Sequence, residues 1–232
     1  ESGYEVTWSG TRGYPRTATF HEGRLYLGGT KSRPNTLFGS RVARFFDFNP
    51  GEGLDDDSIE ATLDTDSVNA IIGLFSGRDL QIFTKGGEFF VPQSSLDPIT
   101  PSNIVINGST RRGAKEGIKP VGVESGTLFI QKSGKAVREF SFSDTELSYV
   151  SSNISLLSSH LLSTPVDMAL RKATSTTEGD MLMIVNTDGT LVMYSLLRDQ
   201  NVIAPSLAST GPETATITVS DYANIAVGTE LT

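Results

Sequence analysis

Short hydrophobic runs separated by glycine and polar residues make up most of the chain. In the first three runs the apolar residues lie two apart, as Leu80 and Ile82 do, which places them on one face of a strand. Glycine-containing turns such as Asp188-Gly189 supply the positive φ angles that tight hairpins need. A strand–turn–strand unit of this kind recurs over residues 22–29, 77–91, 125–142 and 181–196. The pattern predicts an all-β, antiparallel fold built as an array of short hairpins.

Two segments depart from simple alternation. The run Met181 to Val185 is apolar at every position, which predicts an inner strand covered on both faces. Residues 152–162 place Ile154, Leu157 and Leu161 at helical spacing, so one short helix is expected there with these three residues on one face.

The spacing of the repeats bears on the architecture. Successive leading leucines lie 55, 48 and 63 residues apart, from Leu25 to Leu80, Leu128 and Leu191. Propeller blades repeat at about 40–50 residues, so the array is compatible with irregular β-propeller-like blades. An irregular sandwich or a series of hairpins fits the same spacing. We expect one propeller-like domain over residues 1–205. A terminal hairpin over 206–232 either closes that domain or begins the next module.

Composition narrows the class of protein. The 232 residues carry a net charge of −8, which argues against a nucleic-acid-binding face, because such faces are basic. There is no cysteine, so disulfides and thiolate chemistry are absent. No apolar run approaches the ~20 residues that span a bilayer. The chain begins at Glu1 and not at Met, which suggests a piece of a longer protein.

Few residues offer chemistry. His21 and His160 are the only histidines, and no G-x-S-x-G motif accompanies them, so both are interpreted as ordinary packed or surface residues. The acidic run at residues 55–66 lacks EF-hand spacing and is interpreted as a solvated loop, although cation binding stays open. The aromatic groups Phe45-Phe46-Asp47-Phe48 and Phe89-Phe90 are assigned to the core. We therefore expect no catalytic, cofactor-binding or metal-binding residues, and no enzyme.

A long set of motifs resembles one protein family. The segment Arg12 to Leu25 reads RGYPRTATFHEGRL, and the matching motifs that follow it in the same order extend to about residue 200. They include Leu27-Gly28-Gly29-Thr30, Gly39-Ser40-Arg41, Phe45-Phe46-Asp47-Phe48, Asp55-Asp56-Asp57, Ser76-Gly77-Arg78-Asp79-Leu80, Gly86-Gly87-Glu88 and Asp188-Gly189-Thr190-Leu191. In this the chain resembles the tail nozzle proteins (tail tubular protein B) of short-tailed bacteriophages and prophages. It departs from them at Val202 to Pro205, where family members often carry a tryptophan.

The resemblance implies a structural virion protein. Such proteins form a homo-hexameric ring beneath the tail adaptor and extend the DNA exit channel, with DNA as passing cargo. They have β-propeller-like domains and no catalytic site or cofactor. The implied location is the phage tail, assembled in the host cytoplasm. Two alternatives stay open from the sequence: a glycan-binding or glycan-cleaving β-propeller of a host-recognition apparatus, and a cellular β-propeller scaffold unrelated to phage.

Overall fold

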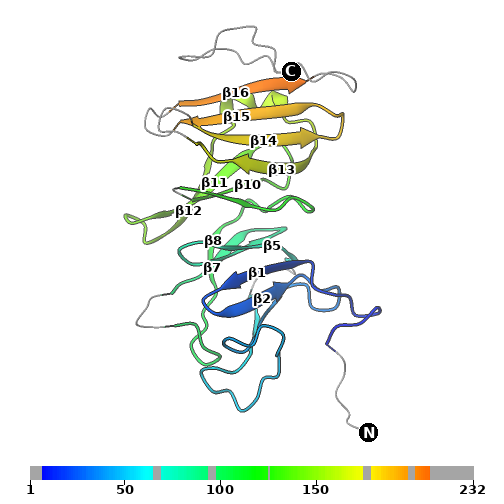
Figure 1. Ribbon diagram of the computed structural model, residues 1–232, viewed down its shortest axis with the longest axis vertical. Coiled ribbons are helices and arrows are strands. Elements are labelled where there is room, and N and C mark those ends of the chain that lie inside the picture. The colour runs from blue at the N-terminus through cyan, green and yellow to red at the C-terminus, as the bar shows by residue number, and fades with distance from the viewer. Residues whose placement is uncertain are drawn as a thin grey trace. The chain divides into compact units, whose positions relative to one another are not determined.

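A computed structural model describes residues 7–64, 69–93, 98–124, 126–174, 179–197 and 202–209 (Figure 1). These residues form four small sheets of four strands each, and the strands of each sheet are consecutive along the chain. The first sheet holds β1 (Thr17–His21), β2 (Arg24–Gly28), β3 (Thr36–Gly39) and β4 (Ile59–Thr62). The second holds β5 (Ile71–Ser76), β6 (Leu80–Thr84), β7 (Glu88–Val91) and β8 (Asn107–Thr110).

The second half repeats this arrangement. The third sheet holds β9 (Val121–Val123), β10 (Gly126–Ile130), β11 (Val137–Ser143) and β12 (Ser148–Asn153). The fourth holds β13 (Pro165–Arg171), β14 (Asp180–Asn186), β15 (Leu191–Leu197) and β16 (Val202–Ser209). Each of the four repeats seen in the sequence lies in a different sheet. The expectation of an all-β, antiparallel array of short hairpins with one short helix is confirmed.

The chain divides into two compact units. Unit 1 comprises residues 1–116 and 142–150, and unit 2 comprises residues 117–141 and 151–232. Each unit has a hydrophobic core made by two of the sheets. Ten buried side chains form the core of unit 1, namely Tyr26, Leu37, Ile59, Leu63, Ile71, Leu74, Leu80, Ile82, Val91 and Ile99. The core of unit 2 includes Leu128, Ile130, Val137, Leu182, Ile184, Val192, Tyr194 and Leu196.

The two sheets of unit 1 approach closely at Gly29. This residue has φ +78°, and a Cβ built there would lie 2.3 Å from the carbonyl oxygen of Ile71, the first residue of β5. The N–H of Ile71 in turn donates to the carbonyl of Pro34 at 2.8 Å. Only glycine readily adopts this left-handed conformation and, having no Cβ, also avoids the clash with Ile71. Gly29 thus permits the contact through which the sheets share one core.

The predicted helix is present but differs in kind. It is a 3₁₀ helix, η1, over Leu156–Leu161. The first two residues of the predicted segment, Ser152 and Asn153, instead belong to the end of β12. Ile154 and Leu161 pack against the core of unit 2 whereas Leu157 is 93% exposed, so the prediction that the three lie on one face is wrong. The reason is local: Ser158 has a non-helical backbone (φ −126°), and it interrupts the regular period on which the prediction depended.

The apolar run at 181–185 is an inner strand, as predicted, since β14 pairs with β13 and with β15. It is not covered on both faces. Leu182 and Ile184 are fully buried, whereas Val185 is 39% exposed, so one face of the sheet forms the core. The predicted terminal hairpin at 206–232 lies outside the described residues, except that β16 continues to Ser209 and pairs with β15. In the part of the chain that the structure describes, no helix is long and apolar enough to cross a bilayer.

Candidate functional site

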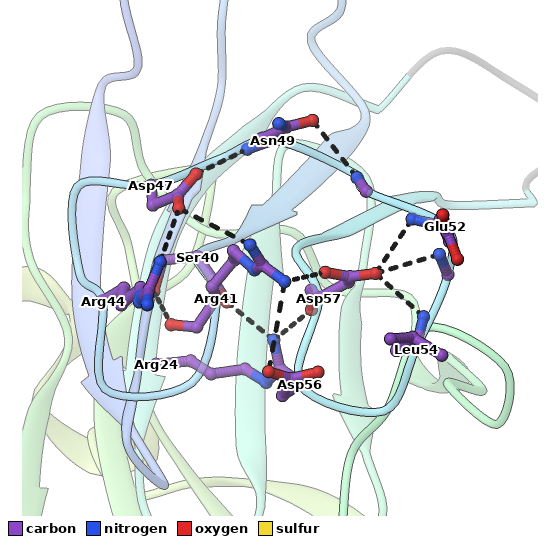
Figure 2. Close-up of polar contacts among 12 residues, drawn as sticks. Arg24, Ser40, Arg41, Arg44, Asp47, Asn49, Glu52, Leu54, Asp56 and Asp57 are labelled. Atoms are coloured by element: carbon purple, nitrogen blue, oxygen red, sulfur yellow. Dashed lines mark hydrogen bonds and ion pairs between the residues drawn. The ribbon is translucent and has the colours of Figure 1, made fainter.

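The most organised polar region of the chain is the long connection between β3 and β4. We call residues 40–58 the Asp57 loop, because the carboxylate of Asp57 lies at its centre and is only 1% exposed (Figure 2). Its Oδ2 accepts the backbone N–H groups of Glu52, Gly53 and Leu54 at 3.1, 3.0 and 2.9 Å. Its Oδ1 accepts a hydrogen bond from the guanidinium of Arg41. One carboxylate therefore closes a turn of the backbone and binds a cation at the same time.

These bonds explain the acidity of Asp57. The N–H of Leu54 contributes most to lowering the pKa of this carboxyl below its ordinary value, and Arg41 and the N–H groups of Glu52 and Gly53 act in the same direction. Burial acts the other way but does not prevail. Asp57 is consequently a buried anion that the loop itself neutralises.

A second buried charge supports the loop from the sheet side. Arg24, the first residue of β2, is buried, and burial lowers the pKa of its guanidinium. It donates hydrogen bonds to the backbone carbonyls of Ser40, Asp57 and Asp55 at 2.7, 2.5 and 2.6 Å. Both ends of the Asp57 loop are thereby bound to a single side chain of β2.

Backbone hydrogen bonds and one ion pair hold the middle of the loop. The N–H of Arg41 donates to the carbonyl of Asp47 at 2.9 Å, and the two side chains form an ion pair at 3.9 Å. The N–H of Val42 donates to the carbonyl of Asp56 at 3.0 Å, and that of Ala43 to the carbonyl of Gly23 at 2.8 Å. The loop is held along its length by its own backbone and by the β1–β2 turn.

What the loop presents outward is aromatic. Phe46 is 91% exposed, and Phe45 is also exposed, with its ring 5.1 Å from Phe20 in an edge-on arrangement. Phe48 turns inward instead and meets Trp8 at 5.0 Å. The prediction that Phe45 and Phe46 belong to the core is therefore wrong. The Arg41–Asp47 bond and the exposed turn between them direct these two rings to solvent.

The acidic run is also only partly a solvated loop. Asp55 and Asp56 are exposed, as predicted, but Asp57 is buried by the bonds described above. Asp64 is exposed, and Asp66 lies outside the described residues. Within the described ranges, no three His, Asp or Glu side chains are grouped as a metal site. The oxygens of Asp57 already accept three backbone N–H groups and the guanidinium of Arg41, so they are not disposed to bind a metal ion.

His21 lies in a separate polar cluster of unit 1. It is buried, and its Nδ1 and Nε2 lie 2.8 Å from Ser76 Oγ and 2.7 Å from Gln93 Oε1. The order Ser–His–Gln resembles a nucleophilic dyad with an orienting group. However, an amide replaces the carboxylate that would stabilise an imidazolium, and the N–H of Gly77 next to Ser76 already donates to Asp79. His21 is therefore a packed residue that joins the ends of three strands, while His160 is exposed on η1.

The cluster continues to Asp79. Its two oxygens accept the N–H of Gln93 at 3.1 Å and the hydroxyl of Tyr149 at 2.8 Å. Burial, and the bond to Asp79, raise the pKa of Tyr149 to about 12. These contacts give His21 and Asp79 structural roles in unit 1.

Sequence reasoning did not identify Arg24, Arg41 and Asp57 as a set. Arg24 bonds to groups 16 to 33 residues away and Arg41 to Asp57 16 residues away, and most partners of Arg24 and Asp57 are backbone groups. The available signal was indirect, because all three lie in the motifs that carry the family resemblance. No protein-family model matches the chain, and no curated protein matches it either.

Proposed function

We propose that this chain is a structural component of the tail of a short-tailed bacteriophage, acting in the nozzle ring through which DNA leaves. One observation carries the proposal beyond the motif resemblance. The motif residues Arg24, Ser40, Arg41, Asp47 and Asp57 bond to one another, and their combined effect is to hold an exposed aromatic surface. An exposed aromatic surface held in this way suits contact with another protein.

Charge supports the same function. The Asp57 loop exposes the carboxylates of Glu52, Asp55 and Asp56, and the chain as a whole carries −8. Phosphates are repelled by such a surface, which suits a protein that DNA passes without binding. The tail proteins that surround such a ring would be its partners.

The experiment is immuno-gold electron microscopy of virions from the source culture, with antibodies raised against this chain. Gold at the distal end of short tails is the expected result. Intact virions without gold would contradict the proposal. Antibodies against denatured chain, applied to disrupted virions, would control for epitopes buried by assembly.

Exposed aromatic rings favour a second candidate, the glycan-binding function. Sugars stack on aromatic side chains, and Phe20, Phe45 and Phe46 are all accessible. Here Phe20 and Phe45 meet edge-on, which leaves no continuous flat platform. A glycan array decides: binding that is lost in Phe46→Ser supports this function, and no binding excludes it for the isolated chain.

A further inference from the structure

The loops at one end of unit 1 are rich in arginine and lysine. β1 begins at this end and β2 finishes at it, and the N–H of Arg16 joins them by donating to the carbonyl of Gly28 at 2.9 Å. β5 also begins here, because a Cβ built at Gly28 would lie 3.0 Å from the side chain of Ile71. The N–H of Ser32 donates to the carbonyl of Arg12 at 2.9 Å, which adds the β2–β3 loop. We call this region the basic end. Its cationic side chains are those of Arg12, Arg16, Lys31, Arg33, Lys85, Arg111, Arg112 and Lys115.

The segment that follows β8 completes the basic end. The N–H of Ala114 in this segment donates to the carbonyl of Thr84, the last residue of β6, at 2.9 Å. Glu116 forms ion pairs with Lys85 at 2.6 Å and with Arg16, so the segment also reaches the start of β1. The two sheets of unit 1 therefore present these cations on one continuous surface.

Two carboxylates neutralise part of that surface. Glu116 is shared between Lys85 and Arg16, and Glu60 pairs with Arg33 at 2.5 Å. The bond from Lys85, together with the charge of Arg16, lowers the pKa of Glu116 below its ordinary value. Glu116 is thus an anion that offsets two cations at once.

Two further carboxylates offset only part of the remaining charge. Glu88 is buried and accepts the N–H of Arg112 at 3.2 Å, and Asp64 is exposed, whereas Asp66 lies outside the described residues. Among the residues that the structure describes, no ion pair uses the side chains of Lys31, Arg111, Arg112 and Lys115. The net charge of −8 therefore conceals a local excess of positive charge.

The scarcity of apolar side chains narrows the class of partner. Within the described ranges, Tyr14 is the exposed large hydrophobic side chain of the basic end, whereas Phe20 and Phe45 meet toward the opposite end of β1. Stable protein interfaces bury an apolar core, and membrane-bound surfaces insert aromatic or aliphatic side chains. A surface of cations with one tyrosine offers neither, so it fits a hydrophilic polyanion.

We propose that the basic end binds the phosphodiester backbone of duplex DNA without regard to sequence. Arginine is the commoner cation of this surface, and its planar guanidinium pairs bidentately with phosphate oxygens. Neighbouring strands lie about 4.8 Å apart, so loops at the ends of several strands spread their cations over the width of a DNA groove, about 6–12 Å.

This contact goes beyond the proposed function, in which DNA passes without binding. It is inferred from the charge of the surface and not from location in a virion. Binding through phosphates alone still lets a protein slide along DNA, because it has no preferred register.

The test is fluorescence anisotropy of a labelled duplex of random sequence, titrated with the chain at several salt concentrations. The four cations without an ion pair predict that log K falls against log salt with a slope of about −4. Affinity should therefore drop roughly 100-fold between about 50 and 200 mM salt. A second duplex of unrelated sequence should bind equally well.

The change Arg111→Gln with Arg112→Gln removes two of these cations. Both side chains are exposed, so the fold should be retained, which circular dichroism can show. The salt slope should become shallower by about 2. Arg171→Gln with Lys172→Gln is the matched control, because this adjacent basic pair is also exposed but belongs to unit 2. It should leave the slope unchanged.

Glu116→Gln should act in the opposite direction. It releases Arg16 and Lys85 from their shared carboxylate, so DNA should bind severalfold more tightly at low salt and the slope should steepen by about 1. Damage to the fold would weaken binding, so a gain is diagnostic. Glu146→Gln removes an exposed carboxylate from the hairpin 142–150 and should change nothing.

Three results would overturn the inference. They are no binding at low salt, equal effects of the substitutions and their controls, and displacement of DNA by polyglutamate or phosphatidylglycerol vesicles of equal charge as effectively as by unlabelled DNA. The last result would assign the surface to an acidic protein or a membrane. Gold on phage tails without DNA binding would remove this contact and leave the proposed function, and DNA binding with unlabelled virions would do the reverse.

Discussion

At the scale of single residues, buried charge stabilises the Asp57 loop, beside the packing of Phe48 on Trp8. Burying an ion is costly unless hydrogen bonds and opposite charge compensate for it. Asp57 has three N–H donors and Arg41, and Arg24 has three carbonyl acceptors. Removing either side chain should therefore do more than remove one contact, since several partners lose their bonds together.

The change Asp57→Asn tests the anion. The amide is nearly isosteric, but its NH₂ group must face either the N–H groups of residues 52–54 or the guanidinium of Arg41, and both are donors. We expect the melting temperature at neutral pH to fall by several degrees. The control Asp55→Asn, at an exposed side chain, should leave it unchanged.

The pH dependence of that difference has a definite sign. Because the folded state lowers the pKa of Asp57, its carboxylate stabilises the protein fully above the ordinary value of 3.8. That contribution is lost as the pH falls through the lower pKa of the folded state. Melting curves of wild type and Asp57→Asn should therefore converge in acid. A gap that stays constant down to that range would contradict the assignment.

Arg24→Met tests the cation, since methionine keeps an apolar stem and removes every donor. Three carbonyls of the Asp57 loop lose their partner, and an unsatisfied buried polar group costs about 1–3 kcal/mol. We expect a loss of roughly 3 kcal/mol in the free energy of unfolding, measured by denaturant titration. Arg44→Met, at an exposed arginine, should cost little. Equal effects of the two substitutions would contradict the role given to Arg24.

At the scale of elements, the alternation of apolar and polar residues identified the strands well. Which side chains outside the strands are exposed depended on contacts that this alternation does not show. Leu80 and Ile82 are fully buried on β6, as their spacing indicated. Phe45 and Phe46 are as hydrophobic as core residues, yet the bonds of Arg41 and Asp57 turn them outward. These bonds are between polar groups, and Arg41 and Asp57 are 16 residues apart, so hydrophobicity alone could not reveal them. The face of η1 was missed for a local reason, the irregular backbone at Ser158.

Gly29 offers a test of how the two sheets of unit 1 meet. Gly29→Ala should be strongly destabilising, because its Cβ collides with the carbonyl of Ile71 and its backbone is left-handed. Gly189→Ala is the matched control: its φ is +82°, but nothing lies within 4 Å of the added Cβ. Gly189→Ala should cost only the backbone strain, about 1–2 kcal/mol, and Gly29→Ala clearly more. Equal losses in chemical denaturation would show that the close approach is unimportant.

At the scale of the whole molecule, the repeats indicated four hairpin arrays but not their grouping. Each predicted repeat occupies its own sheet, so strand order along the chain was predictable. The sheets then share cores in pairs, and unit 1 also takes in residues 142–150. Neither fact has a local signature, because every hairpin shows the same alternation whichever sheet it packs against. The candidate site was predictable to a similar extent: the sequence showed its motifs but not the bonds between them.

The separate cores predict regional effects of core substitutions. Ile82→Ala and Leu182→Ala each remove a fully buried side chain, the first from unit 1 and the second from unit 2. Such changes typically cost about 2–5 kcal/mol. Native-state hydrogen exchange should show faster exchange mainly in β5–β8 for Ile82→Ala and mainly in β13–β15 for Leu182→Ala. Uniform acceleration across the chain in both variants would contradict two separate cores.

The three N–H groups on Asp57 have one more consequence, which concerns entropy. Successive backbone amides that converge on one anion form a concave nest of the kind that elsewhere captures phosphate or sulfate. Here the chain provides its own anion, so the loop reaches its final conformation before it meets any partner. Ordering a flexible segment on association consumes binding energy, and this segment is already ordered. The entropic cost of binding at Phe46 therefore comes mainly from fixing side chains and not from ordering the backbone, so even a small contact surface can contribute to affinity.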